Sequence, residues 1–379
     1  MHNDIHQNTV GELLSRLPRD KMAALKPLFW SELNYHAANQ TLATRDWPEK
    51  AISAVAEGPT LFATAGQDDG FHIIYCRLSA DRLLLGAERE IITRLLRQGH
   101  DYALFIFSDR EQHNWHFVNV RNEQHGKARD RRVFRRITVG PHERLRTATE
   151  RISLLDVSTL SPDLVGLSPL TVQNRHDVAF NVEAVTDEFF KMYRSVFDSL
   201  QSDLALQTGE PRWAHDYALQ FLNRLMFLYY VQRKRWLGDD PDFVCHFWET
   251  YETARRPRDT FVSEWLSVLF FQAFNNKFQA GRTDLQYMPE SLRHALAMAP
   301  YLNGGLFKVN DTDRAYQAQI TDARFRAIFE FLERYNFTIS EDTPLDQEVA
   351  VDPEMIGKVY ESLVNVSDEA DERGEAGIF

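Results

Sequence analysis

Short apolar runs separated by polar turns occupy the part of the chain from residue 59 to residue 157. Four runs rich in Ile, Val, Phe and Tyr are typical of β-strands, at 71–79, 102–109, 115–121 and 132–139. Between the first two runs, apolar residues share one face of a predicted helix over 86–99. The pattern predicts an α/β domain with a small mixed sheet, and its size suits one hydrophobic core.

Helical spacing dominates on both sides of this domain. Residues 1–58 are predicted as a helical N-terminal segment, and residues 158–178, which include two prolines, as a linker. Beyond the linker, apolar residues recur at helical spacing, which predicts an all-α connector domain over 179–366 and an acidic tail over 367–379. The fold class is therefore predicted as α+β. Helices are expected in the connector at 181–204, 213–237, 259–278 and 323–335.

The composition is that of a globular protein. Of the 379 residues, 44% are hydrophobic and 12% are aromatic, which is enough to bury a sizeable core. Cys76 and Cys245 lie too far apart in sequence to suggest a disulfide framework or a zinc site with closely spaced ligands. No secretory signal pattern opens the chain, and its richest apolar stretch, 217–236, contains too many polar residues for a membrane span. We expect a cytoplasmic protein without a membrane partner.

Charge is unevenly distributed along the chain, whose formal net charge is −12. Ten Lys and Arg stand against four Asp and Glu in 121–151, whereas twelve acids stand against two bases in 341–375. The basic segment is the obvious candidate for binding phosphate, although arginine clusters also occur on ordinary solvated surfaces. We predict duplex DNA as a partner, contacted through Arg121, Lys127, Arg129, Arg131, Arg132, Arg135 and Arg136.

Several sequence signatures follow one another in the second half of the chain, at 180–193, 222–237, 301–307, 322–342, 348–365 and 374–379. In this order they resemble the region before the methyltransferase domain of fused, type IIG restriction-modification enzymes. The resemblance implies the N-terminal DNA-binding and scaffolding part of a site-specific adenine-N6 DNA methyltransferase that serves in phage defence. It also implies S-adenosylmethionine for a methyltransferase domain that, in the family, begins where this sequence ends at Phe379.

Six residues of these signatures match the family's motifs: Asn303, Gly304, Gly305, Asp352, Pro353 and Glu354. We expect structural roles for them, because Asn-Gly-Gly suits a tight turn anchored by Leu306 and Phe307, and Asp-Pro suits the start of a helix. The sequence contains neither a glycine-containing cofactor loop nor an Asn-Pro-Pro-Tyr-like loop that would grip an extruded adenine. We therefore expect no catalytic residue and no cofactor in this chain.

Two alternatives stay open. In the first, the chain is a non-catalytic interaction subunit that docks a separately encoded methyltransferase through its C-terminal region, 354–379. In the second, the α/β domain is a magnesium-dependent DNA endonuclease, or the relic of one.

The nuclease alternative is weakened by the residues available for it. Asn119-Val120-Arg121 stands where an acid-x-Lys motif would lie, and neither an amide nor an arginine replaces those groups well. Three acids of the domain are available to such a site, Asp68, Asp69 and Asp109, but each lies in a predicted turn. We expect no metal site at His113 and His116 either, because no acid or cysteine cluster completes one.

Overall fold

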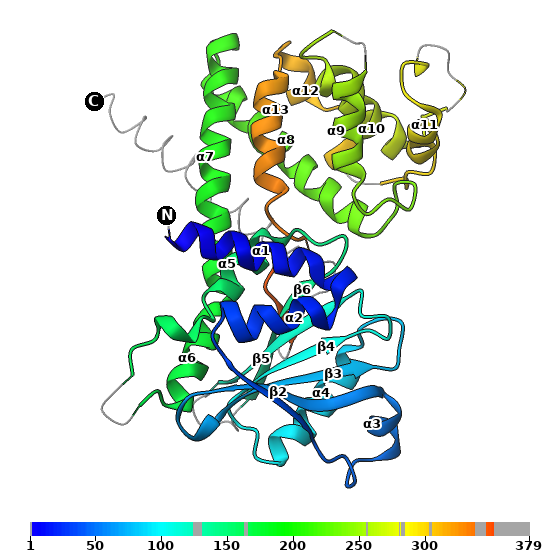
Figure 1. Cartoon of the computed structure of the whole chain (residues 1–379). Coiled ribbons are helices and arrows are strands. Elements are labelled where there is room, and N and C mark those ends of the chain that lie inside the picture. The colour runs from blue at the N-terminus through cyan, green and yellow to red at the C-terminus, as the bar shows by residue number, and fades with distance from the viewer. Residues whose placement is uncertain are drawn as a thin grey trace. The chain divides into compact units, whose positions relative to one another are not determined.

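The structure is a computed structural model that describes residues 2–123, 131–162, 166–254, 257–279, 281, 285–302, 305–337 and 346–351. The described chain divides into two compact units, and the boundary falls within helix α7 (Val182–Thr208), after Val185 (Figure 1). The first unit runs up to this boundary and also takes up Arg334–Asn336 and strand β7 (Asp346–Glu348). The second unit runs from Thr186 to Glu333.

The first unit is built on a mixed sheet of seven strands, as far as the chain is described, and the strands lie in sequence order from β1 to β7. Two pairs are parallel, β3 with β4 and β6 with β7, and the others are antiparallel. The chain passes from β3 to β4 through α4 (Leu85–Arg97), because a parallel pair requires a crossover. The remaining strands are β1 (His36–Thr41), β2 (Val55–Ala65), β3 (Phe71–Leu78), β4 (Ala103–Ser108), β5 (Trp115–Glu123) and β6 (Arg131–Val139).

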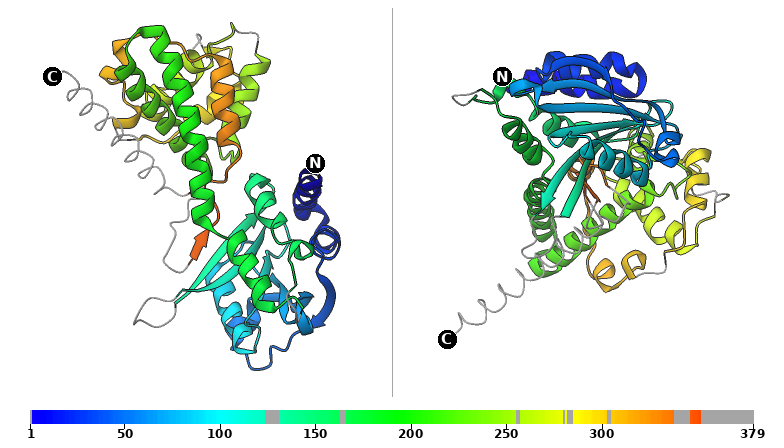
Figure 2. Two further views of the ribbon diagram at one scale, coloured as in Figure 1. Left: turned by 90° about the vertical axis from the view of Figure 1, so that its left-hand side faces the viewer. Right: turned by 90° about the horizontal axis from the view of Figure 1, so that it is seen from below.

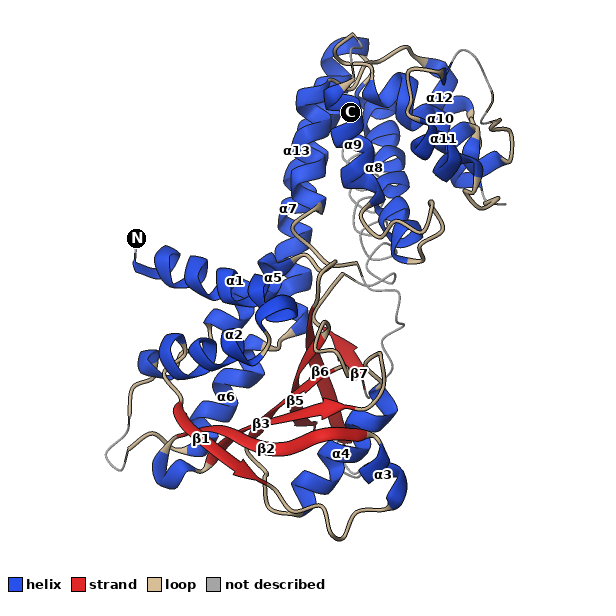
Figure 3. Ribbon diagram, turned by 45° about the vertical axis from the view of Figure 1, so that its right-hand side comes forward, coloured by secondary structure: helices blue, strands red, loops and turns tan. Residues whose placement is uncertain are grey.

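Helices cover both faces of this sheet (Figure 3). On one face, α3 (Glu49–Ser53) and α4 pack on a hydrophobic core supplied by β3, β4, β5 and β6. On the other face, Phe29 follows α2 and stacks on Phe117 of β5. All six residues of β4 are buried, as expected for a central strand covered on both sides. The helices on the second face are α1 (His2–Asp20), α2 (Met22–Pro27), α5 (Leu145–Ser153) and α6 (Pro169–Ala179).

The second unit is helical, and more than half of the residues of its helix α8 (Pro211–Arg233) are buried. Arg224 of this helix is 2% exposed and donates to both carboxylate oxygens of Asp313, at 2.7 and 2.8 Å. It also donates to the Leu306 carbonyl oxygen at 2.6 Å. A buried guanidinium is costly unless its donors are used, so this group ties two later segments to α8. The other helices are α9 (Phe243–Thr253), α10 (Ser267–Phe271), α11 (Glu290–Ala297), α12 (Asp311–Ala315) and α13 (Asp322–Leu332).

The predicted α+β fold class is confirmed, and so are the four predicted strands, which correspond to β3, β4, β5 and β6. The helix predicted over 86–99 is α4, and Gly99 follows it with a φ of +94°, a conformation that favours glycine. Within the described residues, no helix combines the length and the apolar composition that crossing a lipid bilayer requires.

Three segments differ from the prediction. Residues 1–58 are not wholly helical, because β1 and the start of β2 lie within them; β1 is a largely exposed strand with no apolar alternation to reveal it. The second half of the predicted linker is α6, in which Pro169 stands at the first helical position after the capping Ser168. The predicted all-α connector contains β7, which pairs with β6 in the sheet of the first unit (Figure 2).

Candidate nucleic-acid interface

The basic segment of the sequence begins with the antiparallel hairpin of β5 and β6. Successive side chains of a strand point to opposite faces of the sheet, so the arginines of this hairpin do not form one patch. Arg121, which is paired with Val133, lies on the same face as Arg135, toward α6. Arg132 and Arg136 lie on the face that α4 covers.

Arg121 and Arg132 are exposed. Neither has a hydrogen-bond or ion-pair partner among the residues that the structure describes. Their guanidinium groups are therefore available to an anion, although they point to opposite faces of the hairpin. Lys127, Arg129 and the side chain of Arg131 lie outside the described part of the chain.

Arg135 and Arg136 are buried, with 1% and 4% of their surfaces exposed. The Nε of Arg135 donates to Oε1 of Gln347 at 2.9 Å, and its Nη2 donates to Oε1 of Glu183 at 3.1 Å. A guanidinium held in this way has no surface for a phosphate. Because both arginines are buried, we leave them out of the candidate interface.

Asn119, which stands at the position of a nuclease acid, is fully buried on β5. Its side-chain amide donates to Oδ1 of Asp177 at 2.8 Å, and its oxygen accepts from the Gln173 amide at 2.9 Å. These partners lie on α6, so the network fixes that helix to the sheet. No three His, Cys, Asp or Glu side chains in the described ranges come together in a way that could hold a metal ion. In this structure Asn119 is a hydrogen-bonded core residue between β5 and α6.

The three acids that the sequence offered to a nuclease, Asp68, Asp69 and Asp109, lie in connections between strands. Asp109 is 2% exposed and accepts hydrogen bonds from the backbone N–H groups of His113 and Asn114. Asp69 accepts from the Thr64 hydroxyl and contacts the His36 ring at 2.9 Å. Both hydrogen bonds lower the pKa of Asp69, and the bond with His36 contributes most. Asp68 precedes it with a positive φ of 54°.

Two histidines singled out from the sequence lie in different surroundings. His113 is exposed in the turn before β5. His116 is buried on that strand, and its Nδ1 lies 2.8 Å from the carboxylate of Glu88 on α4. The histidine of β5 therefore attaches α4 to the sheet.

Sequence reasoning missed a buried polar group at His176 on α6. Its Nε2 lies 2.7 Å from the Tyr35 hydroxyl, which itself donates to the Leu155 carbonyl. With the hydroxyl proton used there, Nε2–H of His176 donates to Tyr35, and Nδ1 is left without a partner among the described residues. Complete burial lowers the pKa of His176 to about 3. This histidine is a neutral core residue.

A pocket of about 300 Å³ opens beside Arg132 and was also missed. Asp101 and Tyr102 are among the residues that line it, and they come directly before β4. From the sequence, these two residues were expected only to begin or precede the strand predicted over 102–109. No pattern along the chain could have joined them to an arginine on β6.

The family-motif residues fall partly outside the described ranges, namely Asn303, Gly304, Asp352, Pro353 and Glu354. Gly305 begins a short 3₁₀ helix that ends at Phe307. The Phe307 ring is buried and contacts Phe270 and Phe274. Phe307 is therefore a core residue of the second unit, and the turn that it is expected to anchor lies partly outside the described residues.

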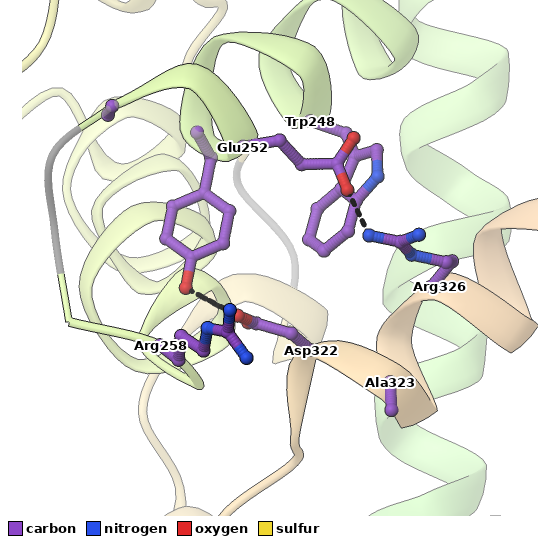
Figure 4. A pocket seen from close by; sticks show the side chains of 8 residues that line it. Trp248, Glu252, Arg258, Asp322, Ala323 and Arg326 are labelled. Carbon is purple, nitrogen blue, oxygen red and sulfur yellow. Dashed lines mark hydrogen bonds and ion pairs between the residues drawn. The ribbon is translucent and has the colours of Figure 1, made fainter.

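A pocket of about 640 Å³ lies in the second unit between α9 and the start of α13 (Figure 4). Asp322 there accepts from the Tyr251 hydroxyl, and Glu252 forms an ion pair with Arg326. Its lining contains two carboxylates and two guanidinium groups, the second being that of Arg258. The formal charges cancel, so this pocket offers no net attraction for the phosphates of DNA.

Comparison with known proteins gives one informative relationship. Over 160 residues, which are 42% of this chain, the sequence is 29% identical to the "Putative type II restriction enzyme and methyltransferase RM.MjaORFECS2P" of Methanocaldococcus jannaschii. The match covers 13% of the length of that protein. No protein-family model and no solved structure matches the chain. The chain is therefore related, over part of its length, to a restriction-modification protein.

Proposed function

We propose that this chain is the N-terminal, DNA-contacting and scaffolding part of a type IIG-like restriction-modification enzyme that methylates adenine on N6 and serves in phage defence. The relationship to a restriction enzyme and methyltransferase carries the proposal. Methyl transfer from S-adenosylmethionine belongs to a domain or subunit that carries the cofactor loop. The chain acts in the cytoplasm, where its duplex DNA partner lies.

DNA contact is assigned to the hairpin of β5 and β6. Arg121 and Arg132 are exposed on it and have no partner within the described residues, so their charge is free to neutralise phosphate. Because they point to opposite faces of the sheet, the hairpin would present one cation on each side to a groove or to neighbouring phosphates.

The scaffolding role is assigned to the attachment of β7. Thr138 of β6 donates to Glu348 at 2.9 Å, and the Val349 N–H donates to the Arg136 carbonyl at 2.9 Å. These bonds fix residues 346–349 beside the strand that carries Arg132. The methyltransferase domain or subunit would contact the C-terminal region, which follows these residues in the sequence.

Binding of a labelled duplex by the intact chain tests this assignment. Replacing both Arg121 and Arg132 with Ala should weaken binding by roughly tenfold or more at low salt, because exposed cations supply most non-specific affinity. Arg16→Ala is the matched control, since Arg16 is an exposed arginine already paired with Asp20 at 2.7 Å. Equal loss in the control and the double variant would contradict the hairpin assignment. Magnesium is included, and cleaved products would favour the nuclease alternative instead.

A further inference from the structure

The pocket beside Arg132 lies at one edge of the core between α4 and the sheet. Its floor includes Leu96 of α4, Phe105 of β4 and Val120 of β5. With a volume of about 300 Å³, it is at the small end of the range in which proteins bind compact ligands. An apolar floor of this kind favours a ligand with flat, apolar faces.

Three of the residues that line the pocket carry polar side chains: Asp101, Tyr102 and Arg132. Across the described ranges, none of the three has a hydrogen-bond or ion-pair partner. A carboxylate accepts hydrogen bonds, a guanidinium donates them, and a phenol does both. The pocket can therefore satisfy a ligand that carries donors and acceptors around the edge of an apolar ring.

We propose that this pocket accepts a nucleobase that has left the stack of bound DNA. The proposal rests on the proposed function, because Arg132 belongs both to the pocket and to the hairpin assigned to the phosphates. A base offers two apolar faces to the floor and to the Tyr102 ring, which is 38% exposed. Its edge offers acceptors to Arg132 and donors to Asp101. A paired and stacked base cannot enter a pocket with a closed floor, so the ligand is an unpaired base.

The test compares two duplexes of the same sequence, one fully paired and one with a single-nucleotide bulge, by fluorescence anisotropy with the intact chain. The wild-type chain should bind the bulged duplex roughly tenfold more tightly, as stacking of one base on an aromatic side chain predicts. Tyr102→Ala should abolish this preference and leave affinity for the paired duplex unchanged. Tyr102→Phe, which keeps the ring, should retain most of it. Tyr301→Ala is the control, because Tyr301 is an exposed tyrosine of the second unit.

Each outcome separates the two proposals. If the wild-type chain binds both duplexes equally, or if Tyr102→Ala keeps the preference for the bulge, the pocket proposal is overturned and the hairpin assignment stands. If Tyr102→Ala fails to fold by circular dichroism, Asp101→Asn replaces it, and the bulge preference should then fall severalfold. If neither duplex is bound at low salt, the proposed function and the pocket proposal are both overturned.

Discussion

The guanidinium of Arg135 on β6 donates a hydrogen bond of 2.9 Å to the side-chain oxygen of Gln347 on β7, although 212 residues separate the two in sequence. The same guanidinium contacts Glu183 at the start of α7. An arginine that the sequence assigns to DNA thus joins three distant segments of the first unit. Arg135 is buried because it lies on the face of β6 that points toward α6, and it therefore contacts other parts of the unit.

Replacing Arg135 with Ala should destabilise the first unit. The change removes the hydrogen bonds that the buried guanidinium donates to Gln347 and Glu183, at a cost of about 2 kcal/mol, and lowers the melting temperature by roughly 4–8 °C if the unit unfolds in one step. Differential scanning calorimetry checks this. Arg132→Ala, three residues earlier and exposed, should change the free energy of unfolding by no more than about 0.5 kcal/mol. Equal shifts for the two variants would refute the structural role of Arg135.

Stability should fall in mild acid because of His176. Its folded pKa of about 3 lies below the ordinary value of 6.5, so between these values the unfolded chain binds a proton that the folded chain does not. The contribution of neutral His176 to the free energy of unfolding is complete above pH 6.5. It falls by roughly 1.4 kcal/mol for each pH unit as the pH decreases toward 3. Urea midpoints at several pH values measure the loss. His176→Gln, which does not titrate, should show a flatter dependence; an unchanged slope would rule out this histidine as the cause.

The two cysteines should differ in reactivity. Cys76 is buried in the core between α4 and the sheet, and burial raises its pKa to about 12, which keeps it a neutral thiol. Cys245 is partly exposed on α9. A thiol reagent should therefore label one site rapidly in the native protein and a second only after denaturation. Rapid labelling of the Cys245→Ser variant in its native state would contradict the burial of Cys76.

Asp313→Asn should destabilise the helical unit strongly. Asp313 and Arg224 are 7% and 2% exposed, and removal of the carboxylate charge leaves a buried guanidinium without its counter-ion, at a cost of about 3–5 kcal/mol. Asp311→Asn, two residues away, removes an acid that pairs with Arg314 on the surface and should have little effect. Thermal unfolding followed by circular dichroism compares them, and similar melting temperatures would show that the buried pair contributes little.

The elements that the sequence predicted well carry their own apolar pattern. β4 is buried along its whole length, and α4 has an apolar face that packs on the sheet, so local composition reveals both. β1 and β7 carry no such pattern and exist because they pair with β2 and β6. The sequence around β7 does not predict it, because β7 has three residues and its partner strand β6 lies about two hundred positions earlier.

The candidate site was predictable in part for the same reason. Composition located the basic segment, and the period of two along a strand could have placed Arg132 and Arg135 on opposite faces. Which arginine becomes buried depends on β7 and on the start of α7, and neither is visible from residues 131–139. The pocket beside Arg132 needs the pairing of strands to bring Tyr102 to it.

The most direct test of the central claim is the salt dependence of duplex binding by the intact chain. Between roughly 50 and 200 mM salt, the logarithm of the association constant should fall linearly with the logarithm of the salt concentration. Each phosphate contact contributes about 0.9 to the slope, so replacing Arg121 and Arg132 with Ala should make it shallower by roughly two. An unchanged slope in that double variant, or no binding by the wild-type chain at the lowest salt, would contradict the assignment of DNA contact to this hairpin.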